Sequence, residues 1–435
     1  MKTLDVYYKS NLAGHLTRDV DDTFRFQYEE NYLESDLPAI SCSLRKKPEE
    51  FVADHLFPFF DGLIPEGWLL KLATDKLRLN PLQDRFELLE NLCHDTIGAV
   101  SIGDRPTVTV DPQRDDLSSI QLDKTDRCMI CYEILGDTDD VYHPSCMKRV
   151  FQKPIVPIVD LNKELVAKLA NHQINKKLAV SGVQRKLSLD FAGTGKTTRL
   201  TMTDMWGRFI FKPEGEAPHL PANEHLCLRL AAAAGIQTED AALIPVTDGT
   251  LGFIARRFDR GRKNERYHQE DFCQILRKES YKKYSGSIEQ IGKALKEYSD
   301  FPGDNLYRLL EVTVFHFLVG NVDAHLKNFS LVYESESGLK RLLSPGYDFL
   351  STDLYLDDQD ETALAINGKK GKLVQKDFLA LTKNLGFEPK ILINVIENFA
   401  SCKPSWCELV TNSFLPEEKK EEFIKLIDSR MTRLE

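Results

Sequence analysis

The chain lacks two features that would place it in a specialised class of protein. Positive charge is not in excess, since 57 Lys and Arg residues face 67 Asp and Glu residues and leave a net charge of −10. An acidic chain does not attract DNA or an anionic membrane through its overall field. A long apolar run is also missing, because residues 312–319, the most apolar stretch, are far fewer than the ~20 that a membrane span needs. We therefore expect no association with membranes.

An export signal is also missing. The first residues, MKTLDVYYKSN, do not contain the continuous apolar core of a signal peptide. The nine cysteines are an odd number and fit a reducing compartment better than a disulfide framework. We expect a cytoplasmic protein, and its 435 residues predict two or three domains.

The stretch DFAGTGKTTRL, residues 190–200, lacks part of the phosphate-binding motif that it resembles. Its Gly195-Lys196-Thr197 ends like a Walker A loop, but the first glycine of that motif should stand where Asp190 is. A strand-like segment, residues 198–203, follows in place of the helix. We expect a hairpin here, with Gly193 and Gly195 in the turn, and no nucleotide.

The order of the remaining patterns predicts an α+β fold of the protein-kinase type with an added small N-terminal α+β domain. Strand-like alternation at residues 4–8 and 23–26 is followed by helical spacing at 51–60 and 81–92. The β-rich part contains one helix, 221–234, after a helical segment at 162–172, and its strand-like segments are 186–191, 198–203, 208–212 and 251–258. The expected domains are an N-terminal unit (1–110), a linker with a Cys/His insert (111–150), a β-rich lobe (151–260) and a helical lobe (261–435).

The stretch LVGNVDAHLKNFSLVY, residues 318–333, carries the most informative spacing. Asp323 and Asn328 are separated as in the kinase catalytic loop, where the Asp takes the proton of the hydroxyl and the Asn binds a metal. About twenty residues later, Asp348 follows a short apolar segment, where kinases place a second metal-binding Asp. Together these residues predict phosphoryl transfer with Mg²⁺ bound by Asn328 and Asp348.

Two upstream segments fit the other parts of a kinase. Lys212 ends the strand-like RFIFKP and predicts a lysine that binds the α- and β-phosphates, with Glu224 as a candidate partner. Before it stands LAVSGVQRKLSLDF, residues 178–191, where a turn at Ser181-Gly182 could expose backbone N–H groups to phosphate. An ordinary turn into a strand is the alternative for this loop.

The chain resembles the HipA family of serine/threonine kinases, the toxins of HipBA toxin–antitoxin modules. The resemblance covers nearly the whole chain. In the N-terminal part it rests on FFDGLIPEGW and LCHDTIGAVSI; in the kinase part it rests on SGVQRKLSL, FIFKP, NEHLCLRLAAAAGI, IARRFDR, EDFCQIL, NVDAHLKNFS and GYDFLS.

The resemblance implies a role for each matching position. Asp323 is the implied catalytic base, and Asn328 and Asp348 are the implied Mg²⁺ ligands. The implied ATP-binding residues are Ser181, Gly182, Val183, Gln184, Arg185, Lys186, Lys212, Arg256, Arg257, Phe258, His325, Lys327, Asn328, Tyr347 and Asp348. Family members often phosphorylate serines in the nucleotide loop; one such position is Ala179 here, which leaves Ser181 as the candidate.

The resemblance also implies partners. The expected substrate is a protein, such as an aminoacyl-tRNA synthetase, whose phosphorylation halts translation. The expected partner is a HipB-like antitoxin with a helix-turn-helix unit, so that this acidic chain would reach DNA only through it. A small-molecule kinase and a nucleotide-binding pseudokinase that acts as a regulator are the alternatives. The toxin-like N-terminal domain argues against the first, and Lys212, Asp323, Asn328 and Asp348 argue against the second.

The insert CMICYEILGDTDDVYHPSC holds four soft metal ligands in two close pairs. Cys128 and Cys131 have the C-x-x-C spacing, and His143 and Cys146 have the H-x-x-C spacing. This set suits tetrahedral Zn²⁺ in a structural site, with no position left open for catalysis. A small hydrophobic clasp without metal is the alternative, because buried thiols persist as apolar groups.

Overall fold

A computed structural model of the chain describes residues 1–103, 125–137, 139–153, 186–192, 199–202, 207–215, 217–246, 249–261, 265–333, 340–356 and 360–435. The expected helix at 162–172 lies outside these residues, as do positions 111–124 of the expected linker. Among the described residues, no helix is both long enough and apolar enough to cross a membrane.

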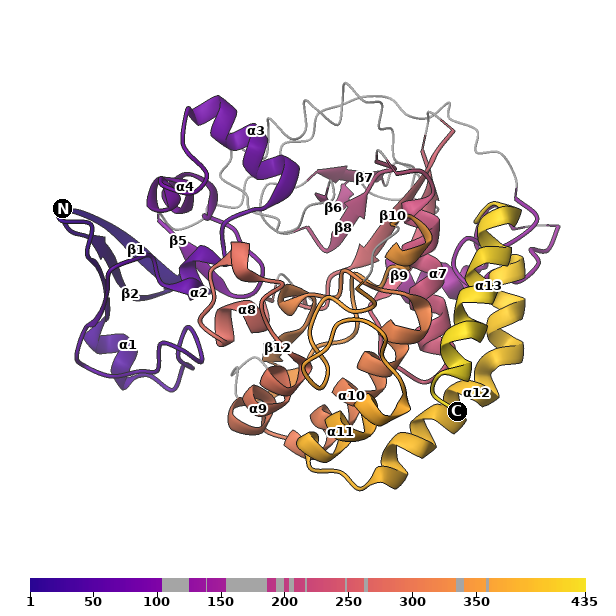
Figure 1. Cartoon of the computed structure of the whole chain (residues 1–435). Helices are drawn as coiled ribbons and strands as arrows, with labels where there is room; N and C mark the ends of the chain where they lie inside the picture. Colours follow the sequence, from indigo (N-terminus) through magenta and orange to yellow (C-terminus); the bar gives the residue numbers. More distant parts are fainter. Residues whose placement is uncertain are drawn as a thin grey trace.

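The N-terminal domain is a five-stranded antiparallel sheet, in the order β4-β3-β2-β1-β5, covered by short helices (Figure 1). Leu4, Val6 and Tyr8 of the first strand are buried and alternate with more exposed residues, as the sequence predicted. The elements are β1 (Lys2–Tyr8), β2 (Asn11–Arg18), β3 (Phe24–Tyr28), α1 (Glu30–Glu34), β4 (Phe51–Ala53), α2 (Pro58–Asp61), α3 (Gly67–Leu77), α4 (Arg85–Leu92) and β5 (Val100–Ile102).

The helix expected over residues 51–60 is wrong. Phe51 pairs with Phe26 in the sheet, and a helix begins only at Pro58. Proline disfavours the helical conformation of the residue before it, and Phe57 is accordingly extended, with ψ 133°. The helix expected from residue 81 begins at Arg85, because Asn80 Oδ1 accepts hydrogen bonds from two backbone N–H groups in a preceding turn.

The β-rich lobe is a second antiparallel sheet, in the order β7-β6-β8-β10-β9, on which α7 packs. Leu189 pairs with Met202 and Ala192 pairs with Arg199, so the expected hairpin at DFAGTGKTTRL is confirmed, although residues 193–198 of its turn are not described. The elements are α5 (Pro144–Phe151), β6 (Leu187–Ala192), β7 (Arg199–Met202), β8 (Phe209–Lys212), α7 (Leu220–Ala233), β9 (Asp240–Pro245) and β10 (Leu251–Arg256).

The helical lobe follows, with a small sheet at the junction of the lobes. In this small sheet, β12 pairs with both β11 and β13. The elements are β11 (Gln269–Asp271), α8 (Phe272–Ile275), η3 (Ser280–Lys282), α9 (Ile288–Tyr298), α10 (Pro302–Val319), η4 (Leu326–Asn328), β12 (Ser330–Tyr333), β13 (Arg341–Leu343), η5 (Thr352–Leu354), α11 (Gln375–Leu385), α12 (Pro389–Asn412) and α13 (Glu417–Thr432). The arrangement is the α+β, kinase-like fold that the sequence predicted.

Two separate hydrophobic cores are joined by a buried network that we call the interdomain clamp. One core lies within the N-terminal domain and the other extends through both kinase lobes and the Cys/His insert. Across the boundary, the N–H of Gly98 donates to Asp259 Oδ2 at 2.9 Å, and Arg266 donates to the carbonyls of Gly98 and Thr96 at 2.9 and 3.1 Å. Asp95 lies 3.1 Å from Arg266. Gly98 has φ +81°, and a Cβ here would lie 2.7 Å from the backbone nitrogen of Gln269, so glycine is required.

Candidate active site

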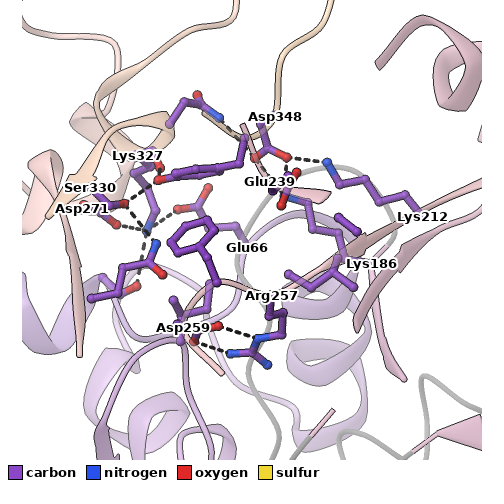
Figure 2. A pocket seen from close by; sticks show the side chains of 18 of the residues that line it. Glu66, Lys186, Lys212, Glu239, Arg257, Asp259, Asp271, Lys327, Ser330 and Asp348 are labelled. Carbon is purple, nitrogen blue, oxygen red and sulfur yellow. Dashed lines mark hydrogen bonds and ion pairs between the residues drawn. The ribbon is translucent and has the colours of Figure 1, made fainter. Parts of the chain in front are cut away.

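A cavity lies between the β-rich sheet and the helical lobe, and the N-terminal domain closes part of it (Figure 2). Many of the side chains that the sequence assigned to ATP line this cavity: Lys186, Lys212, Arg257, Phe258, His325, Lys327, Asn328, Tyr347 and Asp348. Ser181, Gly182, Val183, Gln184 and Arg185 of the expected nucleotide loop lie outside the described residues.

Lys212, at the end of β8, forms ion pairs with Glu224 of α7 and with Asp348. The expected partnership of Lys212 with Glu224 is therefore present. Lys212 and Glu224 are 3% and 1% exposed. Burial alone would lower the pKa of Lys212, but Asp348 and Glu224 raise it above its ordinary value. The lysine is thus a permanent cation in the cavity wall.

Asp348 is the point on which the charged groups converge (Figure 2). Its carboxylate lies 3.1 Å from Lys186 Nζ and accepts a hydrogen bond from Asn328 Nδ2 at 3.2 Å, besides the pair with Lys212. Burial would raise the pKa of Asp348, but Lys186 and Lys212 hold it well below its usual range. Its φ of 55° lies in the left-handed region, which is uncommon for residues other than glycine and frequent at functional sites.

Asp323 stands outside the cavity lining, in the turn between α10 and η4, and is exposed to solvent on one side. The hydroxyl of Tyr284 donates to Asp323 Oδ1 at 2.5 Å. Loss of water around the carboxylate raises its pKa, and the Tyr284 hydrogen bond opposes that rise. An accessible carboxylate with a raised pKa has the properties of a general base.

The segment between Asp323 and Asn328 is fixed by backbone contacts. The N–H of His325 donates to Asn328 Oδ1 at 3.1 Å, and the hydroxyl of Tyr347 donates to the carbonyl of Lys327 at 2.8 Å. Burial lowers the pKa of His325 to about 3, so its ring is neutral at physiological pH. The ring centroids of Phe258 and Tyr347 lie 5.5 Å apart, with the ring planes tilted by 44°, and both residues line the cavity.

The side chain of Arg256 does not line the cavity, and its assignment to the cofactor stays a prediction. Its guanidinium pairs with Asp240, the residue opposite it on β9. Side chains alternate along a strand, so the neighbours Ala255 and Arg257 face the cavity while Arg256 faces away. Arg257 in turn donates two hydrogen bonds to Asp259, at 2.8 and 2.7 Å.

Sequence reasoning missed the contribution of the N-terminal domain. Gly62, Leu63, Glu66 and Ile97 line the cavity. Glu66 lies 2.9 Å from both Lys283 Nζ and Lys327 Nζ. Burial would raise the pKa of Glu66, but the two lysines lower it to about 2. The stretch FFDGLIPEGW was the available signal, although nothing in its composition showed that Glu66 reaches the catalytic loop.

The four ligands of the Cys/His insert converge, with donor atoms of Cys128, Cys131, His143 and Cys146 all within 4.8 Å of one another. His143 Nε2 lies 3.1 Å from the carbonyl of Ile134, which can only accept, so Nδ1 is free to act as a ligand and lies 3.3 Å from Cys131 Sγ. Hydrogen bonds from Cys131 and Cys146 lower the pKa of the Cys128 thiol, which favours a thiolate. These residues fit a closed tetrahedral Zn²⁺ site.

Known proteins resemble the chain along most of its length. Residues 4–103 match the HipA N-terminal domain, and residues 178–406 match the HipA-like C-terminal domain. "Putative kinase Y4mE" of Sinorhizobium fredii is 29% identical over 390 residues, which cover 87% of this chain and 83% of that protein. "Serine/threonine-protein kinase toxin HipA" of Shewanella oneidensis is 28% identical over 246 residues, which cover 52% of this chain and 55% of that protein.

A solved structure of HipA with HipB and operator DNA, also from Shewanella oneidensis, shares the fold. Its TM-score is 0.70 at 21% identity, covering 99% of this chain and 96% of that one. Two family domains in the expected order, relatives named as kinases and a common fold lead to one conclusion. The chain belongs to the HipA family.

Proposed function

We propose that the chain is an ATP-dependent serine/threonine protein kinase of the HipA toxin type. The observation that carries the proposal is the convergence of Lys186, Lys212 and Asn328 on Asp348, with Asp323 outside the same cavity. Phosphoryl transfer needs the phosphate-binding groups and the catalytic base at separate places, because cations and metal ligands hold the phosphates while the base faces the incoming hydroxyl.

Each residue has a defined task in the proposed reaction. Lys212 and Lys186 hold the phosphates of ATP, while Phe258 and Tyr347 contact its adenine ring. Asp323 accepts the proton of a protein hydroxyl while the oxygen of that hydroxyl bonds to the γ-phosphorus. The bond between the γ-phosphorus and the β,γ-bridging oxygen breaks, and ADP leaves. Asn328 and Asp348 would hold Mg²⁺, which supplies positive charge to the phosphates. Asn328 must turn its amide so that Oδ1 replaces Nδ2 beside Asp348.

The relatives support a biological setting for this activity. HipA of Shewanella oneidensis is named a toxin and was solved with HipB and operator DNA. We infer a HipB-like DNA-binding antitoxin as partner, so that DNA contact is indirect, and a cytoplasmic translation protein such as an aminoacyl-tRNA synthetase as substrate. Ser181 remains the candidate for autophosphorylation.

The proposal is tested by incubating the purified chain, [γ-³²P]ATP and Mg²⁺ with a cell extract. We expect label on one or a few proteins, and loss of that label by a factor of about 10²–10⁴ with Asp323→Asn. Label confined to small molecules would instead support a small-molecule kinase. ATP binding without any transfer would support a pseudokinase.

We also propose that the Cys/His insert holds one structural Zn²⁺. Its aromatic and aliphatic side chains belong to the core of the β-rich lobe, so the metal would stabilise that lobe. Metal analysis should find about one zinc per chain, and Cys146→Ser should lose it and lower the melting temperature. A metal-free chain that melts like the zinc-bound chain would favour the apolar clasp.

A further inference from the structure

A second cavity, of about 1050 Å³, opens between the N-terminal domain and the helical lobe; we call it the interdomain cleft. Its walls come from residues around α3 and α4 on one side and from residues 279–283 on the other. Figure 1 shows the N-terminal domain against α8 at this boundary, and α2 contacts α8 directly. The volume reaches the upper end of the ~300–1,000 Å³ range of small-molecule sites, which favours a larger occupant.

The cleft leads to the catalytic base. Glu66 lines both this cleft and the cavity proposed to bind ATP, so the two meet at its side chain. Lys283, at the same end of the cleft, precedes Tyr284, whose hydroxyl binds Asp323. The charge of Lys283 also lowers the pKa of Asp323, as expected of close neighbours. A chain segment in the cleft would therefore pass Glu66 and Lys283, beside the residue that binds Asp323.

The lining has an acidic balance. Its cations are all paired: Arg18 with Glu87, Arg85 with Asp61 and Lys283 with Glu66. The carboxylates of Asp22 and Asp54 are 81% and 94% exposed; Asp22 lies 3.6 Å from Arg18 and Asp54 lies 2.5 Å from His55. Apolar side chains complete the lining, with Leu82 and Tyr281 exposed at 72% and 67%. This combination suits a ligand with both cationic and apolar side chains.

We propose that the interdomain cleft binds an extended, lysine- or arginine-containing segment of the protein substrate and delivers its hydroxyl to Asp323. The proposal rests on the proposed kinase function, because a binding site for a protein substrate has a role only in a protein kinase. Recognition would then need both the N-terminal domain and the helical lobe. It also separates this chain from a small-molecule kinase, which has no use for a cleft of this extent.

The test uses the full chain with Asp323→Asn, so that binding is measured without turnover. The probes are two fluorescein-labelled peptides of twelve residues, one of lysine and leucine around a single serine, the other with glutamate in place of lysine. The cleft variant is Asp22→Asn with Asp54→Lys; asparagine suits the left-handed φ of 62° at position 22. The matched control, Glu417→Gln with Glu421→Lys, makes the same charge change on exposed residues of α13.

Fluorescence anisotropy should show that the lysine peptide binds and the glutamate peptide does not. The cleft variant should weaken binding of the lysine peptide roughly fivefold or more, while the control leaves it unchanged. Equal weakening by both variants, equal binding of both peptides or no binding of either would overturn the proposal. ATP binding, measured on the same samples, tests the kinase function separately, since it does not depend on the cleft.

Discussion

The interdomain clamp and the cavity between the kinase lobes both bury opposite charges, but the charged side chains of the two regions have different kinds of partner. In the clamp, Asp259 receives hydrogen bonds from Arg257, Arg260 and the N–H of Gly98, and Arg266 donates to backbone carbonyls. In the cavity, Lys186, Lys212 and Asp348 pair with one another and with Glu224 and Asn328, in each case through side chains. Charged groups that also bind the backbone are held in place by the fold, whereas pairs made between side chains alone can exchange one partner for a ligand. The comparison assigns stability to the clamp and binding to the cavity.

The largest expected effect concerns activity at the cavity. Asp348→Asn removes the carboxylate on which both lysines and Asn328 converge. Phosphate transfer to extract proteins should fall by about 10³-fold, since several kcal/mol of charge stabilisation at the phosphates depend on the bound metal. Circular dichroism should still show a folded chain at 25 °C. Retained transfer would contradict the role assigned to Asp348.

The next effect concerns stability at the clamp. Asp259→Asn leaves Arg257 and Arg260 buried with a neutral partner, and the free energy of unfolding should fall by about 3–5 kcal/mol. Urea unfolding measures it. The control Asp54→Asn changes a residue that is 94% exposed and should stay within about 0.5 kcal/mol. Equal effects of the two substitutions would show that the clamp contributes no more to stability than an exposed carboxylate does.

Glu66 lines the cavity and, like the clamp, joins the N-terminal domain to the rest of the chain, through its ion pairs with Lys283 and Lys327. Its pKa is lowered from 4.5 to about 2, so its contribution to stability is complete above pH 4.5 and is lost as the pH falls toward 2. A shift of this size corresponds to roughly 3 kcal/mol. Unfolding measured from pH 6 to pH 3.5 should therefore lose less stability in Glu66→Gln than in the natural chain. Parallel curves would show that the lysine pairs contribute nothing.

The smallest effect concerns the pH dependence of the base. The hydrogen bond from Tyr284 opposes the raised pKa of Asp323, so Tyr284→Phe should raise that pKa further. Transfer requires the ionised carboxylate, and its loss on acidification should begin at a higher pH, by less than about one unit. The plateau rate at high pH tests whether the Tyr284 hydroxyl affects the transfer rate in any way other than through the pKa of Asp323. An unmoved acid limb would exclude the hydrogen bond from the mechanism.

Much of the site followed from spacing along the chain. Asp323 and Asn328 were predicted from the spacing of a catalytic loop, Asp348 from its place after a short apolar segment, and Lys212 from its place at the end of a strand. Glu66 and the clamp depend on contacts between distant segments, which no local pattern records. The pairing of Arg256 with Asp240 was not predictable either, because it depends on how β10 lies against β9. The helix expected at residues 51–60 failed because Phe51 pairs with Phe26 and Pro58 restricts Phe57.

The most direct test of the central claim compares the phosphoproteomes of cells that express the natural chain or the Asp323→Asn chain, with growth recorded in parallel. Only the natural chain should stop growth. Only the natural chain should add phosphoserine or phosphothreonine to one or a few proteins of translation. Growth arrest by both chains, or arrest by the natural chain with no new protein phosphorylation, would contradict it.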